Sequence, residues 1–218
     1  MNMRTALIGF GLCVGFGAGM FAAGLIGSAT PTAVAAPEPD PVPRRWQLTV
    51  TPGPLRVTRV EHDGQSRLYY YMTYKVVNTS DTDLLFTPSF EMANDEGELK
   101  RSGRDVPAAV TAKILELLEN PLLDDQINIV GTLLQGEENA KEGLVVWPVN
   151  TPHVRAIEVF GNGFSGETRT IDAYDPQTKG KKRVTLRKTL MLRYQPLGET
   201  KPTGAENLPV IEQRWIMR

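Results

Sequence analysis

The sequence is short of the residues that most often carry enzyme chemistry. It holds one cysteine, Cys13, and two histidines, His62 and His153. A Ser/His/Asp relay or a zinc site would have to use one of these histidines, and neither has a ligand-spaced partner such as H-x-x-x-H. We therefore interpret both as surface residues of turns. The sequence predicts no catalytic residue, no metal ligand and no cofactor.

An excess of charge of either sign is also lacking. The chain has 24 basic and 25 acidic residues in 218, which gives a formal net charge of −1. Nucleic-acid binding needs a basic excess gathered on one face, so we expect no nucleic-acid partner. The dense basic run at residues 179–183 is interpreted as a solvated hairpin tip, with a patch for phosphate or lipid headgroups as the alternative.

A glycine motif in the second half of the chain has the spacing of a dinucleotide-binding fingerprint. Gly161, Gly163 and Gly166 follow a predicted strand in the pattern G-x-G-x-x-G. The residues that follow are alternating and β-branched, so no helix is predicted to receive a pyrophosphate. The acidic residue expected about 20 positions on is missing, since the chain there contains Leu186-Arg187-Lys188. We predict a tight turn that links two strands at one end of the fold, without a nucleotide.

The N-terminus has the order of segments found in a secretory signal. Met1 to Arg4 is a short positive start, residues 6–27 carry no charge, and Ala33-Val34-Ala35 is an A-x-A cleavage site. The apolar segment is also long enough to span a bilayer, and small residues recur at every fourth position in it. We therefore expect an N-terminal apolar helix in residues 1–35, either a cleaved signal peptide or a retained membrane anchor.

Both alternatives for residues 1–35 export the remaining chain. The domain would lie in the periplasm, at the cell surface or in the medium, or stay at the inner membrane, which it would contact only through residues 6–27. Cleavage after Ala35 would remove Cys13, so the exported protein would rely on its hydrophobic core rather than on disulfides. Residues 36–45, APEPDPVPRR, are predicted to form an extended Pro-rich linker ahead of a domain at 46–218.

Residues 46–218 have the alternating pattern of a mainly β domain. The strongest predicted strand is RLYYYMTYKVVN at 67–78, which places Tyr69 and Tyr71 on the face opposite to Tyr70. One face must pack in the core. The other could form a stacking platform for a sugar or peptide, or be covered by a helix or by cross-strand packing. The remaining strands are predicted at 46–50, 55–61, 84–92, 127–134, 143–149, 154–160, 184–194 and 210–218.

A single helix is predicted at residues 105–119, where apolar residues recur at intervals of three and four. Asp105 is a candidate N-cap, and Pro107 would lie in the first turn. We expect its apolar stripe to pack against a sheet edge or one open end of the core. One helix is too few to cover a parallel sheet, so the pattern favours an antiparallel β-sandwich with one inserted helix.

Two stretches resemble the bacterial exported immunoglobulin-like (telokin-like) domains. In YYYMTYKVVNTSDTDLLFTPSFEMANDEGE, a long strand ends in V-x-N-T-S and a second strand runs into an acidic D-x-x-G hairpin. GTLLQGEENAKEGLVVWPV resembles their next signature, a P-G-E turn before a strand G-x-V-x-F-x-V, with Gln135 in place of proline and Trp147 in place of phenylalanine. The resemblance runs from Arg67 to about Phe160 without the helical insertion. It implies an immunoglobulin-like sandwich and no catalytic residues.

These observations favour a non-enzymatic envelope module that binds or scaffolds another protein. The candidate surface residues are Tyr69, Tyr71 and Trp215, and the partner would be an unknown envelope or extracellular protein. Trp215 belongs to the C-terminal run VIEQRWIMR, which could close its own sheet or add to that of another chain. The alternative is a carbohydrate- or cell-wall-binding or hydrolytic domain that uses exposed Tyr69 and Tyr71 with nearby acids.

Overall fold

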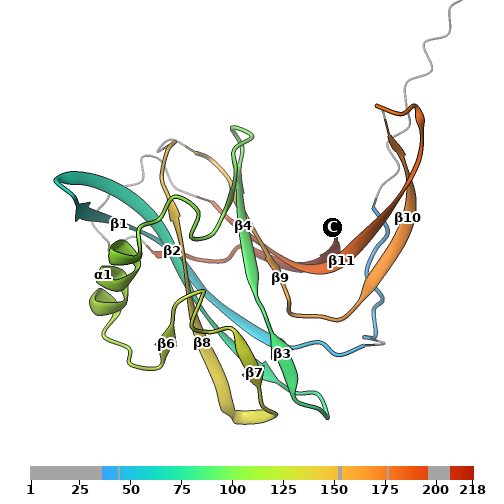
Figure 1. Cartoon of the computed structure of the whole chain (residues 1–218), viewed down its shortest axis with the longest axis horizontal. Helices are drawn as coiled ribbons and strands as arrows, with labels where there is room; N and C mark the ends of the chain where they lie inside the picture. Colours follow the sequence, from blue (N-terminus) through green and yellow to red (C-terminus); the bar gives the residue numbers. More distant parts are fainter. Residues whose placement is uncertain (1–35, 44, 152–153, 176, 196–206) are drawn as a thin grey trace, which may run out of the picture. The chain divides into compact units, whose positions relative to one another are not determined.

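The fold is described by a computed structural model for residues 36–43, 45–151, 154–175, 177–195 and 207–218. The predicted leader, residues 1–35, and His153 lie outside the described residues. The described part is mainly β, and Ala36–Arg218 form one compact unit (Figure 1). Within these residues, no helix is both long enough and apolar enough to cross a membrane.

The first sheet contains the predicted tyrosine-rich strand and has the strand order β12-β1-β2-β8-β6. β1 and β2 form a long antiparallel hairpin through Asp63 and Gly64, whose φ angles of 50° and 72° suit a tight two-residue turn. The strands are β1 (Thr49–His62), β2 (Gln65–Asn78), β6 (Leu123–Asp124), β8 (Gly136–Pro148) and β12 (Asn207–Leu208).

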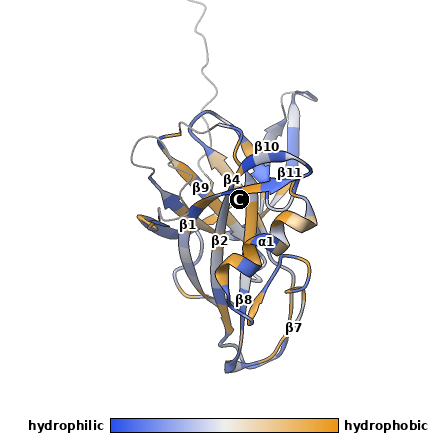
Figure 2. Ribbon diagram, turned by 90° about the vertical axis from the view of Figure 1, so that its left-hand side faces the viewer, coloured by the Kyte–Doolittle hydropathy of each residue, from blue (hydrophilic) through white to orange (hydrophobic). Residues whose placement is uncertain are grey.

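The second sheet is organised around its longest strand. That strand, β11, pairs antiparallel with β10 through residues 180–187, with β9 through 190–194 and with β13 through 188–193. β4 pairs with β9, and β5 pairs with β4. The strands are β4 (Ser89–Asn94), β5 (Leu99–Arg101), β9 (Ile157–Asn162), β10 (Thr168–Asp175), β11 (Gly180–Tyr194) and β13 (Glu212–Met217). The hairpin of β10 and β11 extends beyond the other strands (Figure 1) and is hydrophilic toward its tip (Figure 2).

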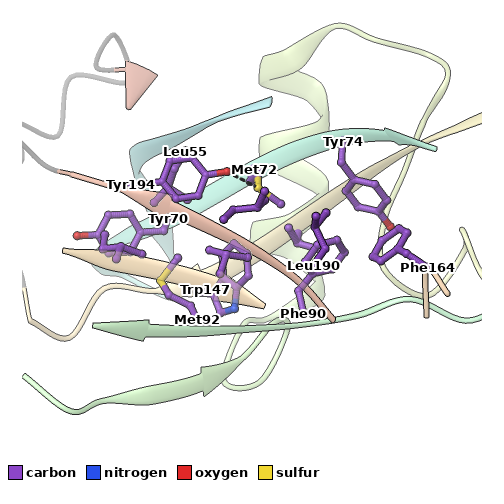
Figure 3. Close-up of a cluster of buried hydrophobic side chains, with 14 of the residues drawn as sticks. Leu55, Tyr70, Met72, Tyr74, Phe90, Met92, Trp147, Phe164, Leu190 and Tyr194 are labelled. Atoms are coloured by element: carbon purple, nitrogen blue, oxygen red, sulfur yellow. Dashed lines mark hydrogen bonds between the residues drawn. The ribbon is translucent and has the colours of Figure 1, made fainter. Parts of the chain in front are cut away.

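The main core lies between the two sheets. Met72 and Trp147 project from the first sheet and Met92 and Leu190 from the second, and all four belong to one buried cluster (Figure 3). The hydroxyl of Tyr194 donates a hydrogen bond to Met72 Sδ at 2.9 Å inside this cluster. Burial raises the pKa of Tyr194, so this hydroxyl stays protonated and can remain a donor. The sheets are therefore joined by side-chain packing.

A smaller second core forms on the outer face of the first sheet. The helix α1 (Ala108–Leu118) buries Val110 and Ile114 against Tyr69 and Tyr71 of β2. The helix therefore covers a sheet face, whereas the sequence analysis placed it at a sheet edge or an open end of the core. A short third sheet pairs β3 (Leu84–Phe86) with β7 (Gly131–Leu133).

The helix begins later than its sequence pattern indicated. Its N-cap is Pro107, with an extended ψ of 142°, and Asp105 lies outside the helix with a left-handed φ of 59°. The prediction of Asp105 as the N-cap is therefore wrong. A residue that precedes proline is disfavoured in helical conformation, so Val106 cannot join the first turn and the helix starts after Pro107.

Prolines also account for two differences in strand boundaries. The Thr51-Pro52-Gly53-Pro54 segment was expected to separate two strands, but β1 continues through it with a register shift between Pro52 and Leu55. β12 pairs with β1 at Leu55 and Arg56, so on that side of β1 the two prolines have no strand partner among the described residues. The strand predicted at 84–92 is instead divided at Thr87-Pro88 into β3 and β4.

Candidate functional site

The Pro-rich segment 36–43, named the arm here, contacts the domain. Prolines alternate along it, so only residues 36, 38, 40 and 42 can donate a main-chain hydrogen bond. Asp40 makes the recorded polar contacts. Its N–H donates to Glu167 Oε1 at 2.9 Å, its carbonyl accepts from Lys188 Nζ at 3.4 Å, and its carboxylate pairs with Arg169 at 3.0 Å. The predicted linker thus contacts the domain through Asp40.

Two of these partners form a buried ion pair. Lys188 Nζ lies 2.9 Å from Glu167 Oε2, and the two side chains are only 3 % and 9 % exposed. Lys188 lies on the same face of β11 as Leu190 and Leu192, where the core between the two sheets ends, and its ammonium is 5.8 Å from the centre of the Trp215 ring. A buried pair stays charged only when both partners are satisfied, and Asp40 supplies one further hydrogen bond to each of them.

The carboxyl group of Glu167 is held ionised by this arrangement. Burial raises its pKa, but the hydrogen bond from the Asp40 N–H and the Lys188 ammonium lower it by more, so the pKa lies below its ordinary value. Arg169 adds a smaller effect in the same direction. The arm therefore meets a charged site rather than a neutral one at neutral pH.

β13 has a free edge beside the arm. The main chains of Arg187 and Arg218 exchange two hydrogen bonds, so the N–H and C=O groups of Arg218 point toward β11. The direction alternates from one residue to the next along a strand, so the N–H and C=O groups of Met217 and Trp215 point away from β11. The amide of Lys188, one residue on from Arg187, bonds to the Glu167 carbonyl, so β10 lies on the other side of β11. Among the described residues, no strand pairs with the outer edge of β13.

Two grooves meet at this edge. One, of about 640 Å³, lies between the arm and residues 214–217, and the other, of about 780 Å³, lies between residues 45–50 and β13. Trp215 and Gln47 line both of them. Gln47 Oε1 is buried and has no hydrogen-bond partner among the described residues. This edge therefore combines a half-buried indole, an unused acceptor and unpaired main-chain groups.

The three candidate surface residues have different environments. Trp215 lies at the groove edge, and β13 pairs with β11 of its own chain. Tyr69 and Tyr71 do not form an exposed surface, because each is 3 % exposed beneath α1, which is one of the two arrangements that the sequence left open. His62 lies beside its neighbour Asp63, with Nε2 3.3 Å from a carboxylate oxygen.

Neither a search for metal-ligand clusters nor the comparisons with known proteins indicate a function for this chain. In the part of the chain that the structure describes, no cluster of three or more His, Cys, Asp or Glu residues could hold a metal ion. No protein-family model, curated protein or solved structure matches the chain. The fold and the grooves thus define a mainly β protein with an open sheet edge, and any function has to be argued from that edge.

Sequence reasoning missed Asp40, Glu167 and Lys188. Lys188 had a detectable signal, because it lies two residues before Leu190 on a face of β11 that is otherwise apolar up to Tyr194. A lysine at such a position needs a buried partner. That partner could not be identified, since Glu167 and Asp40 are 21 and 148 residues away in sequence.

Proposed function

We propose that this protein is an exported, non-enzymatic module with an immunoglobulin-like β-sandwich that binds an extended segment of another envelope or extracellular protein. The leader pattern of residues 1–35 supports export. The two sheets that share one core, together with the motifs from Arg67 to Phe160, support the immunoglobulin-like form.

The free edge of β13 is the observation that carries this proposal. An extended peptide can join a sheet edge by pairing with main-chain groups that have no strand partner, and side-chain pockets beside the edge then select its sequence. Trp215 and Met217 offer such main-chain groups, and the grooves on either side have room for a chain. Half-buried tryptophans are frequent anchors of protein interfaces.

The carbohydrate alternative loses its main support. It required Tyr69 and Tyr71 as an exposed stacking platform, and both rings lie beneath α1. Tyr69 lines a separate hollow of about 290 Å³ with His62 and Arg67, but nothing in that hollow selects a sugar over another small molecule. No observation favours this alternative over protein binding.

The proposal predicts that contact with the partner is confined to one side of the domain. A photo-crosslinking residue at Gln213, on β13, should capture one partner in the native envelope. The same residue at Glu116, on the exposed side of α1, is the control and should capture none. Equal capture from both positions would contradict the proposal.

A proline substitution tests the main-chain part of the same prediction. The N–H of Gln213 points away from β11 by the alternation along β13, so Gln213→Pro removes a free donor and no bond to β11. We expect Gln213→Pro to lose the partner captured from a probe at the adjacent Arg214, while Gln213→Ala keeps it. Unchanged capture with Gln213→Pro in a folded protein would mean that no strand is added there.

A further inference from the structure

We propose that the arm is an internal ligand, and that its docking site recognises an extended acidic segment flanked by prolines in the partner. The partner segment would replace residues 36–43 on Lys188, Glu167 and Arg169. This inference rests on the proposed function, because it assigns the partner chemistry and the regulation of the same edge.

The contacts of Asp40 define what the site selects. Its main chain both donates, to Glu167, and accepts, from Lys188, so the site requires a residue with a free N–H. Its carboxylate pairs with Arg169, so the site requires an acidic side chain. Pro39 and Pro41 have no N–H and restrict the backbone around Asp40 to extended conformations, which lowers the entropy lost on docking.

The arm is held in a way that permits exchange. Glu38, Pro41, Val42 and Pro43 are exposed, and Val42 retains 75 % of its surface. Asp40 joins the arm to Glu167, Arg169 and Lys188, and Pro37 and Pro39 are half-buried beside it. The covalent connection to β1 keeps the local concentration of the arm high.

The site offers a partner more than the arm uses. With the arm docked, about 640 Å³ of groove remains open beside Trp215 and residues 214–217. Arg214 lines the same groove, where its guanidinium pairs with Glu212 at 3.2 Å. A longer segment would gain contacts with Trp215 in addition to those that Asp40 makes.

The test uses the full chain and a synthetic peptide, APEPDPVP, which copies the arm. Asp40→Lys places a cation against Lys188 and Arg169 and should release the arm, seen as loss of order at the amides of residues 38, 40 and 42 in ¹⁵N heteronuclear NOE data. Glu38→Lys makes the same charge change on the same segment at an exposed position and is the control. An arm that stays ordered in Asp40→Lys would overturn the proposal.

Peptide binding then measures competition by the arm. If the arm occupies the site in nine of ten molecules, Asp40→Lys should bind APEPDPVP about tenfold more tightly than the wild type or Glu38→Lys. Adding Arg169→Ala to Asp40→Lys should remove that gain, and APEPKPVP should not show it. Equal affinity of the wild type and Asp40→Lys for APEPDPVP would overturn the internal-ligand assignment.

Two further results would distinguish a separate partner from a second copy of this chain, and the further inference from the proposed function. Dimers of the wild type that exchange arms on mixing would make a second copy the occupant, and would overturn the assignment to a separate partner. Failure of peptide binding alongside specific capture from Gln213 would reject the acidic-segment inference and leave the proposed function standing. Failure of both experiments would reject the two together.

Discussion

At the scale of single residues, the three glycines of the G-x-G-x-x-G motif are required by close packing. A Cβ on Gly161 would lie 2.9 Å from the Phe90 ring, and one on Gly166 would lie 2.6 Å from the Trp46 indole nitrogen. The intervening loop pairs with residues 46–48 and inserts Phe164 into the main core. The absence of a helix after the motif was predicted correctly from the alternating residues that became β10.

The role of the loop differs from the predicted turn. β9 and β10 both run antiparallel to β11, so the loop between them does not reverse the chain as a turn at one end of a sandwich would. It is an excursion between two strands that run in the same direction. A glycine pattern indicates where the backbone is unusual, but it does not say which neighbouring segment comes close.

Gly163 provides the prediction at this scale. Its φ is +90°, and a Cβ there would lie 2.6 Å from the carbonyl oxygen of Thr87. We expect Gly163→Ala to lower the free energy of unfolding by about 2–4 kcal/mol, because a strained dihedral and a main-chain clash act together.

Gly180 is the matched control for Gly163. A Cβ on Gly180 meets only ordinary contacts with Thr178, at 3.7 Å and beyond, so Gly180→Ala should stay within about 0.5 kcal/mol of the wild type. Urea unfolding of both variants tests the pair. Equal effects would show that the packing at Gly163 is not as tight as described.

At the scale of elements, the periodicity of apolar residues identified most strands and the helix. The predicted bounds were wrong at prolines. The alternation of β2 and β11 and the three-to-four spacing of α1 were sufficient to find them. The bounds moved at Pro52 and Pro88, where the effect of a proline depends on whether its N–H would have had a strand partner, and at Pro107, which keeps the preceding residue out of the helix. Whether a proline N–H would have had a partner depends on which strands lie beside it, and the local sequence does not show this.

The helix itself provides the second prediction. Ile114 is fully buried against the outer face of the first sheet, whereas Leu117, one turn on, is 59 % exposed. We expect Ile114→Ala to lower the free energy of unfolding by about 2–4 kcal/mol, and Leu117→Ala to change it by at most about 0.5 kcal/mol. Thermal unfolding followed by circular dichroism measures both.

Unfolding would look different if α1 did not contribute to the stability of the rest of the domain. Ile114→Ala would then melt α1 locally and leave the main transition unchanged, since the core between the sheets shares no residue with the core beneath α1. If the fold depends on the burial of Tyr69 and Tyr71 beneath α1, Ile114→Ala should instead shift one cooperative unfolding transition to a lower temperature.

At the scale of the whole molecule, the candidate site depends on contacts between distant parts of the chain. Asp40 meets Glu167, Arg169 and Lys188 across 127 to 148 residues of sequence, and neither their spacing nor their composition forms a motif. Trp215 was identified because a C-terminal β run with an aromatic residue is a plausible interface. The arm was predicted as a linker because alternating prolines indicate an extended chain without indicating what it contacts.

Acid should release the arm from the domain. The hydrogen bond from the Asp40 N–H lowers the pKa of Glu167 only while the arm is docked, so docking is favoured where Glu167 is ionised and weakens as the pH falls through the lowered pKa. We expect the ¹⁵N heteronuclear NOE of Asp40 to be high at pH 7 and to fall below pH 4, while amides of α1 stay ordered.

The variant Glu167→Gln with Lys188→Met keeps an acceptor for the Asp40 N–H and removes the buried charges. Asp40 and Arg169 are present in both proteins, so a shallower pH response in the variant isolates Glu167, and identical responses would contradict its role in the release.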